Sequence, residues 1–154
     1  MRQGEASGNY FEDFQPGDCF HHWPAKTVQA SDNNLFCLLT MNHHPVHLDE
    51  NFCKEEHPYG QILVVGTYVL SLAVGMSVRD ISALAIANLS YHEVEHHAPV
   101  FVGDTLRAIT RVDSTRLSAS KPDRGIVTVT TSVYNQRETL VLSFERRVLV
   151  PRCP

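Results

Sequence analysis

The chain has 154 residues, of which 43% are hydrophobic and 19% are charged. These fractions are close to those of ordinary globular domains, so they exclude intrinsic disorder and coiled coil, and the length predicts one domain over residues 1–154. The 13 Lys and Arg residues against 17 Asp and Glu residues give a formal net charge of −4. This balance excludes the basic surface expected of a protein that binds nucleic acid.

The start of the chain and the cysteines indicate the cellular setting. Residues 1–8 contain Gly and Ser, and we expect them to be disordered. The segment up to Phe14 carries acidic residues and no apolar stretch, which argues against a secretory signal or transit peptide. The cysteines lie far apart without a CxxC pair and predict free thiols in a reducing cytoplasm: Cys19, Cys37, Cys53 and Cys153. We therefore expect a cytoplasmic protein.

The first half of the chain predicts one strand and two helices. Residues 19–29 alternate as a strand would, and Ser31 and Asp32 are typical of the N-cap and first turn of a short helix through Leu39. Residues 41–59 are rich in His, Pro and Asn and predict irregular structure. The apolar segment at residues 62–78 predicts a buried helix, over about residues 66–78, rather than a membrane span. Three small residues of this helix form a stripe that lets it approach a sheet closely: Thr67, Ser71 and Gly75.

The second half predicts four strands, at residues 83–94, 105–115, 126–135 and 140–150, separated by Gly, Pro and Asn turns. In the third of these, valines and threonines alternate as in a half-buried antiparallel strand. The element order predicts an α+β fold in which a four-stranded meander wraps around one central helix. Because such a sheet keeps an open edge strand, we expect a homodimer.

Nine histidines include the pattern H-E-x-x-H at residues 92–96. In zinc proteases a helix brings both imidazoles of this pattern to one face. Here the preceding residues are strand-like, and Pro99 follows closely, so we interpret the segment as a polar strand end on which His92, Val94 and His96 share a face. No third ligand is evident in the sequence, and we expect no metal site.

The other histidine cluster lies in the string LTMNHHPVHLD at residues 39–49. This string resembles the signature of the MaoC-like family of R-specific enoyl-CoA hydratases. It matches at Pro45, Val46 and His47, and it departs at Met41, Asn42 and His44. Further motifs follow in the family's order over nearly the whole chain, at residues 9–17, 59–60, 66 and 99–106. Residues 85–89 and 146–151 are most similar to itaconyl-CoA and mesaconyl-CoA hydratases.

The resemblance implies a hot-dog fold, an antiparallel sheet wrapped around one long helix, and a hydro-lyase that adds water reversibly to a short enoyl-CoA. It also implies site residues. His47 is the catalytic histidine, Asn42 stands where the family usually carries a catalytic Asp, and the Gly66 N–H belongs to the oxyanion hole. Of the neighbouring histidines, His44 either lines the site entrance or is solvated.

These residue types suit the reaction. Hydration needs a group that deprotonates water, a proton for Cα and donors for the enolate oxygen. Imidazole exchanges protons near neutral pH, so His47 carries the acid–base work. The Asn42 carbonyl oxygen is expected to hold the water, since an amide cannot accept its proton. Asp49 either supplies the missing carboxylate or caps the segment that follows it.

A branched dicarboxylic acyl group needs a cationic partner, and Arg79 is the favoured candidate over Lys54, His43 and His44 because its guanidinium binds carboxylate through two hydrogen bonds. We expect an acyl-CoA substrate and no metal or redox cofactor. Two alternatives remain open. A hot-dog thioesterase would use a carboxylate near the helix start, and a non-catalytic acyl-CoA-binding subunit would explain Asn42.

Overall fold

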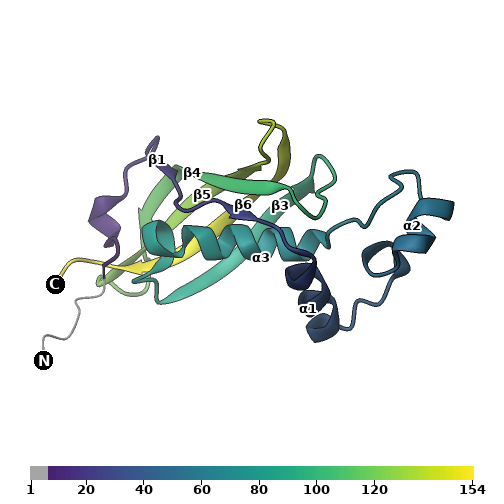
Figure 1. Ribbon diagram of the computed structural model, residues 1–154. Coiled ribbons are helices and arrows are strands. Elements are labelled where there is room, and N and C mark those ends of the chain that lie inside the picture. The colour runs from purple at the N-terminus through teal and green to yellow at the C-terminus, as the bar shows by residue number, and fades with distance from the viewer. Residues whose placement is uncertain (1–6) are drawn as a thin grey trace, which may run out of the picture.

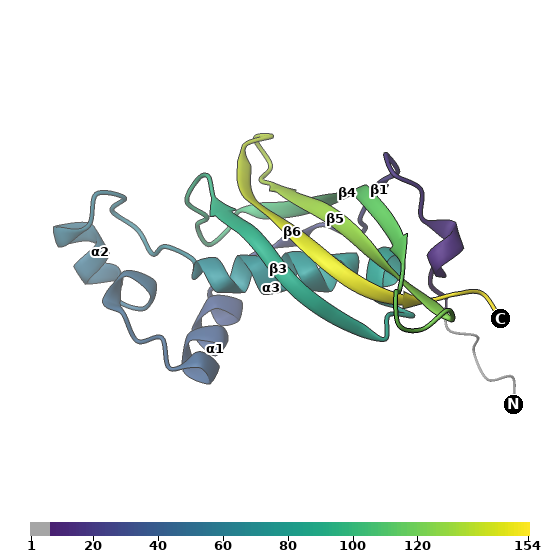
Figure 2. The same cartoon turned by 180° about the vertical axis from the view of Figure 1, so that it is seen from behind.

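The computed structural model describes residues 7–154. It shows an antiparallel sheet curved around one helix, with two shorter helices beyond one end of that helix (Figures 1 and 2). The helices are α1 (Ala30–Thr40), α2 (Glu50–Glu56) and the central α3 (Gly66–Ser77), which continues as a π-helical turn over Val78–Ser82. The predicted α+β architecture around one helix is confirmed. The disorder expected at residues 1–8 lies mostly outside the described residues.

The sheet runs in the order β1-β4-β5-β6-β3, with β2 also paired to β4, and every pairing is antiparallel. The strands are β1 (Cys19–His21), β2 (Lys26–Thr27), β3 (Ala87–His96), β4 (Thr105–Leu117), β5 (Arg124–Tyr134) and β6 (Leu140–Pro151). The predicted first strand is thus two short strands, broken around Pro24, which has no N–H to donate.

The prediction of a four-stranded meander is wrong at one strand. The meander comprises β4, β5 and β6, whereas β3 pairs with β6 at the far edge. The connection from β3 to β4 is held against the start of α3, where the Val64 N–H donates to Val100 O at 2.9 Å and Leu63 bridges Phe101. The chain therefore crosses the end of the helix between β3 and β4.

The core lies between α3 and the concave face of the sheet. In β5 the predicted alternation is confirmed, because Val127, Val129, Thr131 and Val133 are all buried and their neighbours are half-buried. The helix face that meets the sheet was predicted wrongly. The buried stripe is Val69, Ala73 and Ser77, and the stripe of Thr67, Ser71 and Gly75 is exposed. Both stripes have the same helical spacing, and the more apolar one is buried.

Residues 41–59 are more ordered than predicted. A 3-10 turn covers Pro45–His47, and α2 follows. Asp49 is the N-cap of α2, since its carboxylate accepts the Phe52 N–H at 2.9 Å. Of the two roles considered for Asp49, the structure shows the cap. At α1 the cap lies earlier than expected, at Gln29, with Asp32 accepting the Gln29 N–H at 2.9 Å.

Strand β3 is the edge of the sheet and is exposed along almost its whole length. Three apolar side chains on it are 39–47% exposed: Leu89, Tyr91 and Val94. Within residues 7–154 the four cysteines are unpaired, and Cys37 and Cys53 are buried. None of the helices described for this part of the chain has the length and apolarity needed to cross a membrane.

Candidate active site

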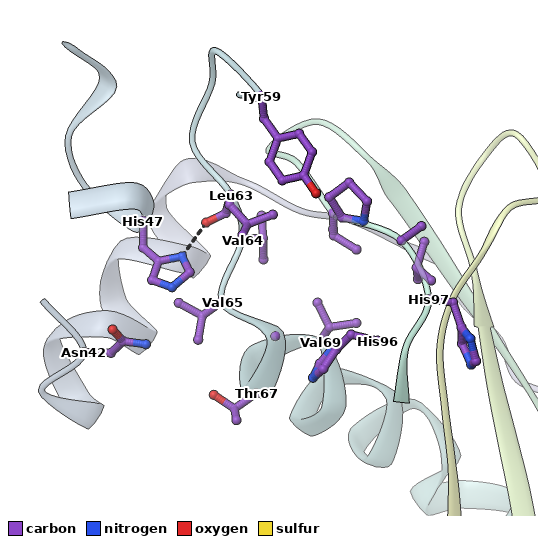
Figure 3. A pocket seen from close by; sticks show the side chains of 15 residues that line it. Asn42, His47, Tyr59, Leu63, Val64, Val65, Thr67, Val69, His96 and His97 are labelled. Atoms are coloured by element: carbon purple, nitrogen blue, oxygen red, sulfur yellow. Dashed lines mark hydrogen bonds between the residues drawn. The ribbon is translucent and has the colours of Figure 1, made fainter. Parts of the chain in front are cut away.

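A pocket of about 520 Å³ opens at the N-terminal end of α3, where the 42–47 segment, residues 63–67 and the end of β3 meet (Figure 3). Its walls are mostly apolar, and its polar side chains are Asn42, His47, Tyr59, Thr67, His96 and His97. Lys, Arg, Asp and Glu are absent from the described lining. The acid–base groups of the described lining are therefore its three imidazoles and the Tyr59 phenol.

His47 is held in one orientation by the backbone of a neighbouring segment. Pro45 begins the 3-10 turn, buried Val46 fixes the turn against the protein, and His47 ends it. The Nδ1 atom of His47 lies 2.7 Å from the backbone oxygen of Leu63, a bond drawn in Figure 3. Because a carbonyl only accepts, Nδ1 carries the proton in the neutral ring, and Nε2 keeps a free lone pair on the pocket side.

Asn42 lines the same pocket from the chain that leaves α1. Its Oδ1 atom lies 3.5 Å from the backbone N of His44, and in Figure 3 the carboxamide nitrogen points to the Val65 side of the pocket. The expectation that the carbonyl oxygen of Asn42 holds a water stays a prediction, and in this orientation that oxygen lies on the side of the His44 backbone N. The NH₂ group is the one available, and it can donate to the oxygen of a water molecule.

The start of α3 offers unoccupied backbone donors. Its N-cap is Val65, which has no side-chain cap. The Val65 N–H is bound to Asn33 Oδ1 at 3.0 Å, whereas the N–H groups of Gly66 and Thr67 have no acceptor in the part of the chain that the structure describes. Free N–H groups at the positive end of a helix stabilise negative charge. Gly66 thus has the free backbone donor that an oxyanion hole requires, and its role in the reaction stays a prediction.

His96 is a site residue that the sequence interpretation missed. Its ring lies against Gly66, where an added Cβ would be 2.6 Å from His96 Cε1 and 2.9 Å from Nε2. It has no hydrogen-bond partner among residues 7–154, whereas His97 Nε2 lies 2.7 Å from Ser143 Oγ. Figure 3 shows the His96 ring pointing across the start of α3.

A bulge in β3 explains the orientation of His96. The register with β6 shifts by one residue between His92 and Glu95, and Glu93 has a φ of 48°. His92 therefore lies opposite Glu145 on the outer face, and His96 lies opposite buried Leu142 on the inner face. The predicted shared face is wrong because simple alternation fails at a bulge. The HEVEH pattern lies on this strand, and within the described residues no group of three potential ligands could hold a metal ion.

Two predicted substrate-binding residues lie outside the pocket. His44 caps the 3-10 turn, with its Nδ1 accepting the Val46 N–H at 3.2 Å, and it packs near Phe52. Arg79 follows the opposite end of α3, about 18 Å away along a 12-residue helix. It lines a second groove with Trp23 and Lys26. The length of α3 therefore separates Arg79 from the pocket that contains His47.

A family model described as mesaconyl-CoA hydratase matches residues 2–154. The chain belongs to this family. The resemblance to MaoC-like hydratases is thereby confirmed, and the sheet around α3 is the hot-dog fold. A mesaconyl-CoA hydratase from Cereibacter sphaeroides is 32% identical over 148 residues, which cover 94% of this chain and 41% of that protein. The chain thus spans less than half the length of the curated mesaconyl-CoA hydratases it matches.

Solved structures give the same architecture. The X-ray structure of a monoamine oxidase regulatory protein from Archaeoglobus fulgidus has a TM-score of 0.85 and 32% identity, covering 97% of this chain and 99% of that one. A Mycobacterium tuberculosis protein with a double hot-dog fold has a TM-score of 0.89 and 26% identity, covering 97% of this chain and 46% of that one. This chain therefore matches a little under half of a double hot-dog protein.

Proposed function

We propose that this chain is a hydro-lyase that adds water to the double bond of a short enoyl-CoA thioester, and that removes it in the reverse direction. The observation that carries this proposal is the His47 ring. Its Nδ1–H is bound to Leu63 O at 2.7 Å, which leaves Nε2 free in a pocket that also exposes the uncapped start of α3. A base and an anion-stabilising group thus face one cavity.

The chemistry balances with these groups alone. His47 Nε2 takes one proton from a water molecule while the water oxygen bonds to Cβ. The C=C π electrons move toward the thioester, and the enolate oxygen receives hydrogen bonds from the N–H groups of Gly66 and Thr67. The His47 imidazolium then returns its proton to Cα. Asn42 holds the water by donating to its oxygen, which leaves one lone pair for the attack on Cβ.

The substrate that we propose is a mesaconyl-CoA type ester, a branched dicarboxylic enoyl-CoA, since relatives at about one third identity bear that name. The walls formed by Val64, Val69 and Val141 fit the apolar part of the acyl group. Its distal carboxylate needs a partner when it leaves water. Because Arg79 lies at the other end of α3, His96 takes this role in the proposal, as a protonatable ring without another partner.

Hydration of a conjugated thioester is not a redox reaction, so the proposed activity needs no redox cofactor. His47 supplies proton transfer and the helix start supplies charge stabilisation, so the proposal includes no metal ion either. The CoA moiety arrives as part of the substrate.

We also propose a homodimer. Strand β3 is paired on one side only, and its other edge carries free backbone groups beside exposed Leu89, Tyr91 and Val94. A double hot-dog relative places in one chain what two copies of this chain would provide. Light scattering should give twice the 17.3 kDa of one chain. Leu89→Lys should shift the protein to monomers, and a monomeric parent at micromolar concentration would contradict this assembly.

The alternative activities are less well supported by the pocket. A thioesterase of this fold would place a carboxylate near the helix start, and the described lining contains none. A non-catalytic acyl-CoA-binding subunit would not need an imidazole with one nitrogen fixed and the other free, as His47 has.

One assay separates the three activities. Purified protein is incubated with mesaconyl-CoA and, separately, with crotonyl-CoA, while the absorbance of the conjugated thioester and the release of free thiol are followed. Loss of conjugation without thiol supports the hydratase. Thiol release supports the thioesterase. Binding of the ester without either change supports the non-catalytic subunit, and His47→Ala serves as the control for contaminating activity.

A further inference from the structure

A fully buried asparagine on α1 connects the two halves of the candidate site. The Asn33 side chain is 0% exposed, and its carboxamide is bonded at both ends. Its Nδ2 donates to the backbone oxygen of His47 at 2.9 Å, and its Oδ1 accepts the backbone N–H of Val65 at 3.0 Å. Asn33 therefore contacts both the segment that carries the base and the residue just before Gly66.

The two segments are also bonded to each other. The Leu63 N–H donates to Val46 O at 3.0 Å, and His47 Nδ1 donates to Leu63 O at 2.7 Å. These two bonds join the segments at Leu63. The Asn33 carboxamide adds a third connection, at Val65, and it is the connection nearest to the start of α3.

The two hydrogen bonds of the Asn33 side chain require a carboxamide at this position. One end must donate to a carbonyl and the other must accept an N–H, which a carboxamide does and a carboxylate of the same size does not. At the start of α3, Asn33 accepts only the Val65 N–H, so within residues 7–154 the N–H groups of Gly66 and Thr67 stay available to a ligand. A buried amide with both ends satisfied is rigid, because breaking either bond leaves a buried polar group without a partner.

We propose that Asn33 is a positioning residue that fixes the distance between His47 Nε2 and the N–H groups at the start of α3. This inference rests on the proposed hydratase activity. A displacement of about 1 Å between reacting groups can cost up to about 100-fold in rate. Loss of Asn33 should therefore reduce kcat while leaving KM little changed, because Asn33 does not line the pocket.

The test compares Asn33→Asp and Asn33→Ser with Asn135→Ala. Asn135 is a similarly buried carboxamide, 2% exposed, whose Oδ1 accepts the N–H groups of Arg137 and Thr139 in the β5–β6 turn, and it does not line the pocket. We expect Asn33→Asp to lower kcat at least about tenfold with KM within about threefold, and Asn135→Ala to lose stability with kcat unchanged. Equal kcat losses at equal loss of stability would overturn the inference.

A measurement independent of turnover separates this inference from the proposed function. Asn33→Asp removes the donor to the His47 backbone oxygen, so the His47 ring should leave Leu63 O part of the time. Nitrogen NMR of the imidazole rings should then show His47 as the Nδ1–H tautomer in the parent and as a mixture of tautomers in Asn33→Asp. An unchanged tautomer would overturn the positioning role. If the parent hydrates no enoyl-CoA but the tautomer changes, the hydratase proposal fails and the positioning role stands. If both Asn33 variants are unfolded at 5 °C while Asn135→Ala is folded, Asn33 is a folding residue and the inference fails.

Discussion

The imidazole of His96 lies so close to the α carbon of Gly66 that an added methyl group would be 2.6 Å from His96 Cε1. This contact joins the edge strand of the sheet to the start of the central helix, and it brings a second imidazole into the pocket with His47. Since the nearest atoms belong to a side chain, a substitution at Gly66 would move the ring and not the backbone.

Gly66→Ala is the first test of that contact. The variant keeps the backbone N–H, so a loss of activity would come from the added methyl group in the pocket and the displacement of His96 that it causes. We expect at least a tenfold lower kcat/KM for mesaconyl-CoA, about 1.4 kcal/mol, with an unchanged or slightly raised melting temperature. Gly75→Ala is the matched control on the same helix, because nothing lies within 4 Å of its added Cβ. It should gain up to about 1 kcal/mol of stability and keep full activity.

His96→Gln tests recognition of the distal carboxylate. Glutamine keeps a polar side chain but cannot carry a positive charge, so mesaconyl-CoA should lose at least about tenfold in kcat/KM while crotonyl-CoA stays within about threefold. His92→Gln, on the outer face of the same strand, should leave both substrates unaffected. Equal losses with both substrates would mean that His96 acts in the hydration step and not in carboxylate recognition. A higher kcat/KM of the parent for crotonyl-CoA than for mesaconyl-CoA would contradict the proposed dicarboxylic substrate.

Asn42 tests the departure from the family signature. If Asn42 only holds the water, Asn42→Asp should retain measurable hydration, because a carboxylate can still hold the water by accepting from its O–H. Asn42→Ala should lower kcat at least about tenfold. Asn34→Ala, an exposed asparagine on α1, is the control. An inactive parent that gains activity as Asn42→Asp would identify a degenerate site. An Asn42→Ala variant as active as the parent would show that the assigned role is wrong.

Tyr68 makes the fold sensitive to alkaline pH. Burial, with the negative charge of Asp32 nearby, raises the pKa of Tyr68 to about 12. The unfolded chain releases this proton near pH 10, so the free energy of unfolding should fall between pH 10 and about 12, where the folded state still holds the proton. Tyr68→Phe keeps the edge-on aromatic contact with Phe36, and its free energy of unfolding should decrease less over this pH range. Denaturant unfolding of both proteins at pH 8, 10 and 11 measures this decrease. An equal decrease in the parent and in Tyr68→Phe would contradict the prediction.

Much of the fold could be predicted from local patterns. The alternation in β5 and the apolar run of α3 predicted the bounds of these elements to within a few residues, because the buried face of each element leaves a periodic pattern in its own sequence. Strand order could not be predicted in this way. Whether β3 pairs with β4 or with β6 depends on how residues 97–104 pass the start of α3, which is a contact between distant parts of the chain.

The candidate site shows the same division. The short signature at residues 39–49 carries His47 and Asn42, and a further family motif carries Gly66; all three line one pocket. His96 was hidden because a one-residue bulge reverses the face that simple alternation assigns to it. Arg79 was chosen for its charge alone, although the predicted helix over residues 66–78 already placed it at the opposite end from Gly66. Asn33 had no sequence signal, since its role lies in two backbone contacts.

The most direct test of the hydratase account is the fate of water oxygen. Mesaconyl-CoA is incubated with the parent and with His47→Ala in water enriched in ¹⁸O, and the intact CoA ester and the free acid are analysed by mass spectrometry. The account predicts one ¹⁸O in a hydroxyl on an intact thioester, formed by the parent at least about 100-fold faster than by folded His47→Ala. Label found only in the carboxylate of a released acid, or equal labelling by folded His47→Ala, would contradict it.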